Sequence, residues 1–478
     1  MPDVSCHPEG ARRPKDLVEP CETPSFDFLH KEILASGLFG ESSGELPWRL
    51  SPEPFAITVE QWEFFQILGE DLLEFYLAAD QLFLDSLCNK LPSWVLDYLT
   101  MRIDAPIKEL GMARDARGQR VRVIRPDVLL TKDGKAITEL DSVPGGIGWT
   151  AALNMVYENA GFEVIGSGQM MEKNFSRMLV EVAQKDGPYW GIVVSEESAD
   201  YWHEMVWLGK RLKGLGLDGE VIKPEDLRPC DNGLCGKSGQ RIDVLYRFFE
   251  LFDYRSLPPW ELIVYALKSH QVRVTPPIKS YPEEKLLFAL FHHPCLEGFW
   301  RDRLGAGRHE RLRKIFPKTW ILDPRPLPPH AIVGDVTIQG RPIQKWEELF
   351  TLTQRERHLV IKPSGYSPLA WGSRGVIIGH DQPQDKWARQ LEGALDGFHK
   401  CPYILQQYRD PRRVAMRFYN TVSGDLIAQE GRARLCPYYM VYDGKAHLSG
   451  ILATICPLDK KLIHGMQSAV MAPCRVAA

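Results

Sequence analysis

Three carboxylates in one short segment have the type and spacing to hold a divalent cation. Asp127 lies in an apolar run, and Glu139 and Asp141 stand two residues apart at the end of a second run, after the turn Asp133-Gly134. Asp-Gly favours a hairpin, and alternation along a strand places Glu139 and Asp141 on one face with Asp127 across from them. Converging carboxylates repel one another, whereas Mg²⁺ prefers oxygen ligands and takes one or two carboxylates with substrate phosphates. The segment predicts a magnesium site, although its spacing alone also fits a solvated hairpin edge.

A lysine and a turn of small residues much later in the chain could bind phosphate. Lys362 ends a strand-like run over 358–362, and the segment Gly372-Ser373-Arg374-Gly375 begins ten residues after it. A lysine can meet phosphate as a point charge, and small residues let backbone N–H groups approach phosphate oxygens. An ordinary strand–loop–strand with a surface lysine is the alternative.

Arginines could supply positive charge to the same site. Arg125 stands two residues before Asp127 and shares its face of the strand, where its guanidinium could contact phosphate through two hydrogen bonds. Arg417 and Arg434 lie in later strand-like runs, and arginines stabilise charge on a phosphoryl group during transfer. We predict catalytic roles for all three, with structural ion pairs as the alternative for Arg417 and Arg434.

These segments resemble motifs of the ATP-grasp enzymes. The series R-x-D, E-x-D and Pro-Gly before a helix (125–146) is similar to the metal-binding segment of D-alanine–D-alanine ligases. I-K-P followed by G-S-x-G-V (361–376) is similar to the family's phosphate-binding part. The resemblance implies two Mg²⁺ ions bridged by Glu139, with Asp127 and Asp141 each holding one. The chain departs from the family at Asp141, where asparagine is usual.

The resemblance also implies contacts to ATP. Lys362 would contact the phosphates and the glycine turn would cover them, while Lys285 is a weaker match to an earlier ATP lysine of the family. Gln406 and Gln407 stand at the place of the strand that hydrogen-bonds adenine. No counterpart of the family's ribose-binding acid is assigned.

The order of these parts resembles the circularly permuted ATP-grasp group, which includes proteins similar to glutathionylspermidine synthetases. The metal hairpin comes first, and a region of alternating strands and helices separates it from the lysine and the glycine turn. The resemblance implies an ATP- and Mg²⁺-dependent ligase that joins a small-molecule or peptide carboxylate to an amine through an acyl phosphate, releasing ADP and phosphate. An ATP-grasp kinase and a catalytically silent nucleotide-binding protein remain as alternatives.

The elements that would position these groups predict a mixed α/β (α+β) fold. Apolar residues at helical spacing predict helix within 58–100, and strands alternating with helices over about 162–325 indicate an open sheet. After the proline-rich segment 323–331 the chain is strand-rich. We predict a permuted ATP-grasp core with an inserted open-sheet α/β domain. The expected parts are a partly disordered N-terminal extension (1–50), a helical segment with the metal hairpin (51–160), the α/β domain (161–330) and the ATP-binding lobe (331–478).

A dinucleotide site is a competing hypothesis. The pattern G-x-G-x-x-A over 146–151 follows a strand and opens a helix, as in NAD-binding folds. However, the preceding strand ends in Glu139 and Asp141, which would lie close to an anionic pyrophosphate, and the expected acid after the next strand is absent. An NAD-dependent oxidoreductase is therefore the least favoured alternative.

Composition limits the remaining classes. The net charge of −4 gives no basic field for nucleic acid or an anionic membrane, so we expect neither partner. No stretch approaches the roughly 18–20 apolar residues of a membrane span, and no apolar segment follows the N-terminal charges as in a signal peptide. The ten cysteines show no zinc spacing, and we expect reduced thiols, including the closest pair Cys230 and Cys235, in a cytoplasmic protein.

Overall fold

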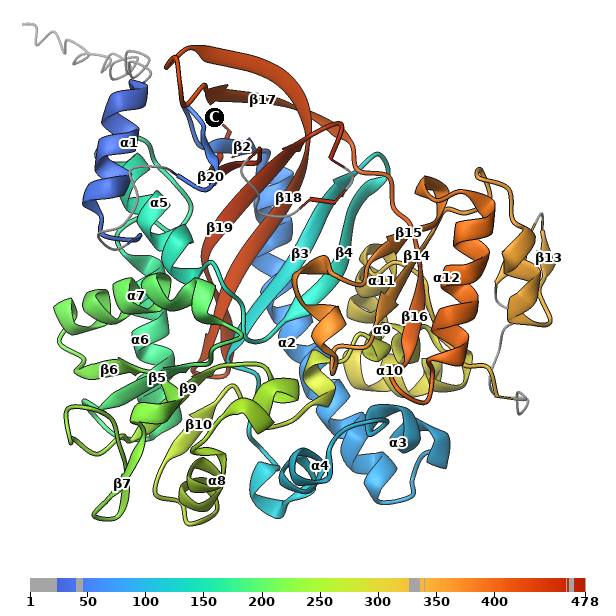
Figure 1. The fold of residues 1–478 in the computed structure, drawn as a ribbon, viewed down its shortest axis with the longest axis horizontal. Coiled ribbons are helices and arrows are strands. Elements are labelled where there is room, and N and C mark those ends of the chain that lie inside the picture. The colour runs from blue at the N-terminus through green and yellow to red at the C-terminus, as the bar shows by residue number, and fades with distance from the viewer. Residues whose placement is uncertain are drawn as a thin grey trace, which may run out of the picture.

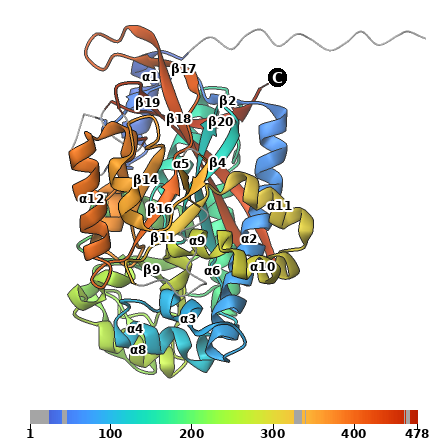
Figure 2. The same ribbon diagram turned by 90° about the vertical axis from the view of Figure 1, so that its right-hand side faces the viewer.

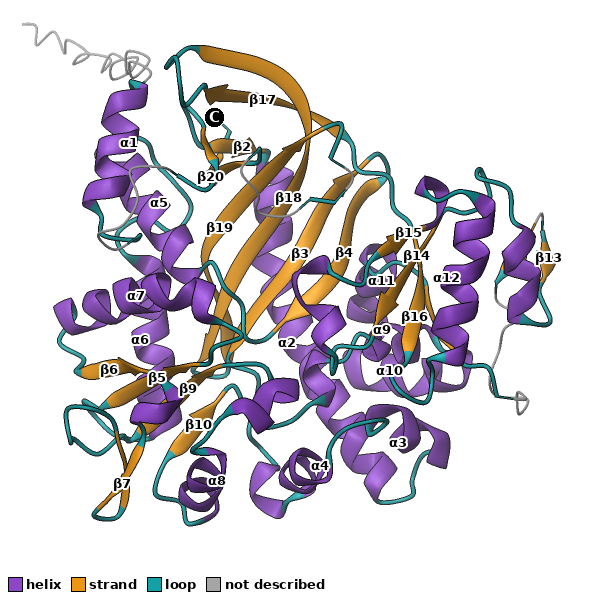
Figure 3. Cartoon of the chain, viewed as in Figure 1, coloured by secondary structure: helices purple, strands orange, loops and turns teal. Residues whose placement is uncertain are grey.

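The computed structural model describes residues 24–39, 46–325, 336–338, 340–460, 462–463 and 468–477. Within these ranges the chain forms one sheet of eight strands, two sheets of four and two small hairpins (Figures 1 and 3). The mixed α/β prediction is thereby confirmed. Residues 1–23 and 40–45 of the predicted N-terminal extension and most of the proline-rich segment lie outside the described residues, while α1 (Phe26–Ala35) lies within them.

The large sheet carries the predicted metal hairpin. β3 (Val123–Thr131) and β4 (Gly134–Asp141) form the hairpin, and β3 also pairs with β18 (Leu426–Tyr442). The strand order is β1-β20-β19-β18-β3-β4, with β17 paired to β18 and β2 to β20. These other strands are β1 (Arg49–Leu50), β2 (Phe55–Ile57), β17 (Arg413–Tyr419), β19 (Lys445–Pro457) and β20 (Val470–Val476). The hairpin predicted at Asp133-Gly134 is confirmed, and a second hairpin joins β18 to β19 through Asp443-Gly444.

Helices cover both faces of this sheet. α2 (Val59–Leu87) begins at a capping box of Thr58 and Gln61 and shares a hydrophobic core with Leu435 of β18. α5 (Ile147–Asn159) and α6 (Met170–Ala183) share a second core with Cys436, the next residue along the strand. Because successive residues of β18 enter different cores, this part of the strand is buried on both sides, which explains its continuous apolar sequence.

The predicted open α/β region is confirmed. β10 (Arg273–Thr275), β9 (Val244–Phe248), β5 (Trp190–Val194) and β6 (Gly219–Ile222) form a parallel sheet in that order, with α7 (Trp202–Gly214) and α8 (Trp260–Lys268) in the connections. The order in which strands are added reverses between β5 and β9, because β5 is followed by β6 on one side and β9 by β10 on the other. The carboxyl ends of two such strands are the usual place for a ligand crevice. The apolar run 162–165 after α5 is not a strand, because the Phe162 N–H donates to Tyr157 O and closes the end of the helix.

The third sheet contains the predicted phosphate-binding lysine strand. Its order is β11-β16-β14-β15, all antiparallel, formed by β11 (Thr319–Leu322), β16 (Tyr403–Gln407), β14 (Leu359–Pro363) and β15 (Ile377–Ile378). In the view from the right of Figure 1, this sheet and α12 (Gln384–Asp396) lie in front of the large sheet (Figure 2). β11 falls within the range predicted for the α/β domain, but it pairs with β16 of the third sheet. The lobe that contains this sheet therefore includes residues before the predicted boundary at 331. The strand that follows the glycine turn, β15, is only two residues long and pairs with β14.

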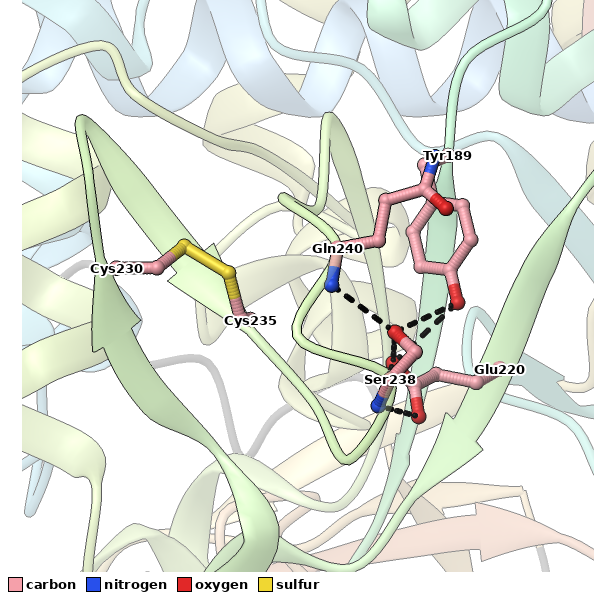
Figure 4. The surroundings of a disulfide bond; sticks show 6 residues. All are labelled: Tyr189, Glu220, Cys230, Cys235, Ser238 and Gln240. Carbon is pink, nitrogen blue, oxygen red and sulfur yellow. Dashed lines mark hydrogen bonds between the residues drawn. A yellow bond between two sulfur atoms is a disulfide. The ribbon is translucent and has the colours of Figure 1, made fainter.

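Shorter elements complete the described chain. They are α1 (Phe26–Ala35), α3 (Ser93–Leu99), α4 (Ala105–Met112), α9 (Leu286–His292), α10 (Glu297–Leu304), α11 (Ala306–Ile315) and the hairpins β7 (Arg228–Cys230)–β8 (Gly233–Cys235) and β12 (Thr337–Ile338)–β13 (Arg341–Pro342). A disulfide joins Cys230 to Cys235 across the first hairpin (Figure 4). The expectation of reduced thiols is therefore wrong for this pair, because hairpin pairing brings their Cα atoms to 5.9 Å, within disulfide reach.

Candidate active site

A cavity of about 540 Å³ lies where the large sheet, the parallel sheet and the glycine turn approach one another. Its charged side chains include Arg125, Asp127, Glu139, Asp141, Asp200, Glu250 and Arg434. Its other lining residues include Trp48, Val143, Trp149, Tyr201, Phe248, Ala370, Gly372, Cys436, Tyr438, Leu452, Thr454 and Met471. The cavity thus joins a charged part to an apolar, aromatic part.

The hairpin places the three predicted carboxylates in this cavity. Asp127 stands opposite Glu139 and Arg125 stands opposite Asp141 in the β3–β4 register, with an irregularity directly after Asp127. All four residues line the cavity, as their shared face in the sequence predicts. The three carboxylates therefore line one cavity, while metal binding stays a prediction.

Each carboxylate has a cationic partner. Arg125 donates to Asp127 at 2.7 Å and to Asp141 at 2.5 Å, and Arg434 donates to Asp127 at 2.8 Å. Burial opposes ionisation, but the two guanidiniums outweigh it and lower the pKa of Asp127. The Nε atoms of both arginines are buried without a hydrogen-bond partner among the described residues.

Two lysines from outside the large sheet, Lys285 and Lys362, contact the β3–β4 hairpin. Lys285 Nζ lies 2.8 Å from Glu139 Oε1, and this partner raises the pKa of the lysine despite its burial. Lys362 Nζ donates to Thr138 O at 2.8 Å and to Gln406 Oε1 at 2.9 Å, and burial lowers its pKa to about 8. Both lysines predicted to contact ATP therefore lie at the hairpin predicted to bind metal. The sequence match to the family was weaker for Lys285.

The glycine turn reaches the cavity through Gly372 and the neighbouring Ala370. The segment Pro368–Ser373 is a 3₁₀ helix, and Lys285 donates to Ala370 O at 3.4 Å. Arg374 points to the parallel-sheet region instead, where it pairs with Glu197 at 3.1 Å. The side chain of Ser373 lies outside the described part. At Gly375 an added Cβ would lie 2.7 Å from Pro363 Cγ, so this glycine permits close packing of the turn on β14.

Two predicted roles do not fit the geometry. Arg417 lies on β17 with its side chain half-exposed and paired with Glu53 at 2.9 Å, and it is not part of the described cavity lining. β16 is flanked by β11 and β14, and the Gln407 N–H donates to Lys318 O, so this backbone is already used where adenine would bind. Gln406 is buried between Lys362 and Thr319, which makes it a positioning residue for the lysine.

Sequence reasoning missed two partly buried acids beside the site. Glu250 follows β9, lines the cavity and has a pKa raised by burial and by Glu283. Glu283 forms an ion pair with Arg247, which is fully buried within β9. Two signals were present: an arginine inside an apolar strand, and an acid directly after the carboxyl end of a parallel strand.

A side chain occupies the space at the start of α5, where the sequence resembles a dinucleotide-binding site. Glu204 of α7 accepts from the Gly148 N–H at 2.9 Å, and an added Cβ on Gly148 would lie 2.7 Å from Glu204 Cγ. The Glu204 side chain fills this place and takes the Gly148 N–H, so it excludes a pyrophosphate from the N-terminus of α5 by volume. The geometry therefore argues against the NAD alternative.

The donor set of the hairpin suits Mg²⁺ in chemistry. Among the described residues, no three histidine, cysteine, aspartate or glutamate side chains lie close enough together to hold one ion. Mg²⁺ needs only one or two carboxylates when phosphates supply the remaining ligands, and Asp127 and Glu139 are neighbours across the hairpin. Arg125 and Lys285 would then release these carboxylates to the ion.

Comparisons with known proteins support the fold. No protein-family model and no curated protein matches the chain. Among solved structures, it is similar to a glutathione synthetase-like effector from Globodera pallida in its apo form, with a TM-score of 0.56 and 13% identity over 94% of this chain and 95% of that chain. A putative gamma-glutamylcysteine synthetase from Methylobacillus flagellatus KT gives a TM-score of 0.42 and 11% identity over 86% of this chain and 87% of that chain. The first likeness shows a shared fold across nearly the whole chain.

The described helices also bear on the membrane prediction. Not one helix in the described ranges combines the length and the apolar character that crossing a membrane requires.

Proposed function

We propose that this chain is an ATP- and Mg²⁺-dependent ligase that joins a carboxylate to an amine and releases ADP and phosphate. The observation that carries the proposal is the meeting of Asp127, Glu139 and Asp141 with two arginines and two lysines beside one cavity. The fold shared with a glutathione synthetase-like effector supports the same reaction class. A circularly permuted ATP-grasp core and a cytoplasmic location belong to the proposal.

The charge of the site suits a triphosphate with magnesium. Arg125 and Arg434 line the cavity and bring positive charge toward phosphate oxygens, and Lys285 and Lys362 add positive charge behind the hairpin. Mg²⁺ would be held by Asp127 and Glu139, with Asp141 next to them, and would neutralise charge on the transferring phosphoryl group.

The chain's own residues would then position the acid and the amine. The acid's carboxylate would lie against Arg125 and Arg434, oriented so that its oxygen attacks the γ-phosphorus and ADP leaves. Amine attack on the activated carbonyl releases phosphate and a proton, and Glu250 lines the same cavity as a nearby acceptor.

Calorimetric titration of ATP with and without Mg²⁺ tests the nucleotide half of the proposal. We expect Mg²⁺-dependent binding that Glu139→Gln and Lys362→Met each weaken by about tenfold or more, since each removes a charged contact. The matched controls Glu261→Gln and Lys210→Met change exposed residues outside the cavity and should leave binding unchanged. Binding indifferent to Mg²⁺ and to both site variants would contradict the proposal.

ADP release tests the reaction itself. A ligase should release ADP only when both an acid and an amine are present, and the amide should appear in equal amount. ADP release with an acceptor alone, and a stable phosphorylated product, would instead identify a kinase.

A further inference from the structure

The apolar part of the cavity is built from aromatic rings in contact. Trp48 lies 5.3 Å from Trp149, Trp149 lies 5.9 Å from Tyr201, and Tyr201 lies 5.5 Å from Phe248, measured between ring centroids. All four residues line the cavity, and we call them the aromatic wall. Leu452 and Met471 line the same cavity, so this part is apolar.

The aromatic wall stands where a ligand crevice is expected. Tyr201 belongs to the segment after β5, and Phe248 ends β9. Between these two strands, the order in which strands are added to the parallel sheet reverses. Ligands of open α/β sheets bind outside the carboxyl ends of such strands. Trp149 comes from the first turn of α5, directly beyond the metal hairpin.

A buried donor in the wall lacks a partner. The Trp48 side chain is 2% exposed, and its Nε1–H has no hydrogen-bond partner among the described residues. The same holds for the Thr454 hydroxyl, which also lines the cavity. Both atoms are enclosed by the protein, so a ligand in the cavity would reach them only after a side-chain movement.

The nucleotide reaches the cavity from a different side. Lys285, Lys362 and the glycine turn approach the charged part from the other lobe. The aromatic wall is formed by α5, by the segment after β5, by the end of β9 and by the N-terminal Trp48. A ligand that reaches both parts therefore places a charged group near Arg125 and Arg434 and an apolar group against the wall.

We infer that the carboxylic acid substrate of this site carries an aromatic group, which packs on Trp48, Trp149, Tyr201 and Phe248 while its carboxylate faces the arginines. This inference rests on the proposed ligase function and names the class of its acid. Aromatic side chains gain from offset or edge contacts with a bound ring, and the apolar area removed from water adds to affinity.

Binding of 3-phenylpropionate and propionate to the full chain, measured by saturation-transfer NMR and calorimetry, tests this inference. The two acids share a carboxylate and differ in the ring. We expect 3-phenylpropionate to bind at least about tenfold more tightly. Trp149→Ala and Tyr201→Ala, both at half-buried positions, should each bring the ratio to within about twofold.

Trp202→Ala is the matched control, because Trp202 is half-buried but lies outside the described cavity lining. It should keep the preference for the ring. Equal binding of the two acids, binding of neither, or displacement of 3-phenylpropionate by ATP with Mg²⁺ would overturn the inference, the last by assigning the wall to adenine. If 3-phenylpropionate binds while ATP does not, the acid site stands and the proposed function fails.

Discussion

At the scale of single residues, the site is a balance of buried charges. Asp127 and Glu139 stay ionised because guanidinium and ammonium groups lie within 2.8 Å of them, even though burial alone would favour their neutral forms. Removing one partner of such a pair costs more than the pair contributes, because the other charge is left buried. In the proposed ligase, the same cations would become available to phosphate once Mg²⁺ takes the carboxylates.

Glu204 gives a pH-dependent prediction. Burial raises its pKa to about 8, so between about pH 5 and 8 the folded chain holds a proton that the unfolded chain has released. Stability therefore falls as pH rises through this window. In Glu204→Gln the free energy of unfolding should fall less steeply, by up to about 1.4 kcal/mol per pH unit relative to wild type. Urea unfolding at pH 5, 6.5 and 8 measures this difference.

The control for Glu204 is Glu261→Gln, an exposed glutamate on α8. It should keep the wild-type slope against pH. Equal slopes for Glu204→Gln and wild type would show that Glu204 is ionised throughout this range in the folded chain.

At the scale of elements, Gly146 joins α5 to the large sheet. Its φ is +92°, and an added Cβ would lie 2.2 Å from the Tyr438 hydroxyl, which donates to Gly145 O at 2.8 Å. Gly146→Ala should destabilise the chain by roughly 3 kcal/mol, from backbone strain together with overpacking. Gly168→Ala is the matched control, since Gly168 also has a positive φ but no atom within 4 Å of the added Cβ. It should cost only about 1 kcal/mol by urea unfolding, and equal costs for both variants would contradict the argument.

The hairpin β7–β8 gives a prediction of its own. The disulfide closes a short loop, and Ser238, shortly after it, donates to Glu220 of β6 at 2.6 Å (Figure 4). Replacing Cys230 and Cys235 with serine should lower stability by roughly 2 kcal/mol, the value for closing a loop of this length. Neither cysteine lines the described cavity, so ATP binding should not change. Thiol titration before and after reduction, together with thermal unfolding, tests both statements; an unchanged unfolding midpoint would contradict the first.

Local patterns predicted the elements that depend on neighbouring residues. The β3–β4 hairpin follows from Asp133-Gly134 and the alternation around it, and α2 follows from its helical period and its capping box. Pairings between distant segments were not readable. Nothing in the sequence of β16 shows that β11 and β14 flank it, and the predicted adenine contact failed for that reason. Arg417 and Arg434 both lie in strands of the large sheet, and only the fold distinguishes the edge strand β17 from the site.

At the scale of the whole molecule, the site is assembled from distant parts of the chain. The hairpin, the segments after β5 and β9, and the glycine turn each contribute to one cavity. Arg374 in the glycine turn pairs with Glu197 in the segment after β5, and both side chains are partly exposed at 54% and 31%. Such a pair contributes at most about 1 kcal/mol, so it can exchange for a contact to phosphate.

This exchange predicts that substitutions of the two partners change ATP affinity in opposite directions. If Arg374 leaves Glu197 to contact a bound triphosphate, Arg374→Ala should weaken ATP affinity by about tenfold, while Glu197→Gln should strengthen it a few-fold by removing the competing carboxylate. Neither variant should shift the unfolding midpoint by more than about 2 °C, because the pair is solvent-exposed. Calorimetry with ATP and Mg²⁺ measures both affinities, and Glu196→Gln, the adjacent exposed acid, is the matched control that should leave affinity unchanged. Weakened binding in both Arg374→Ala and Glu197→Gln would instead mean that the ion pair itself holds the turn over the nucleotide.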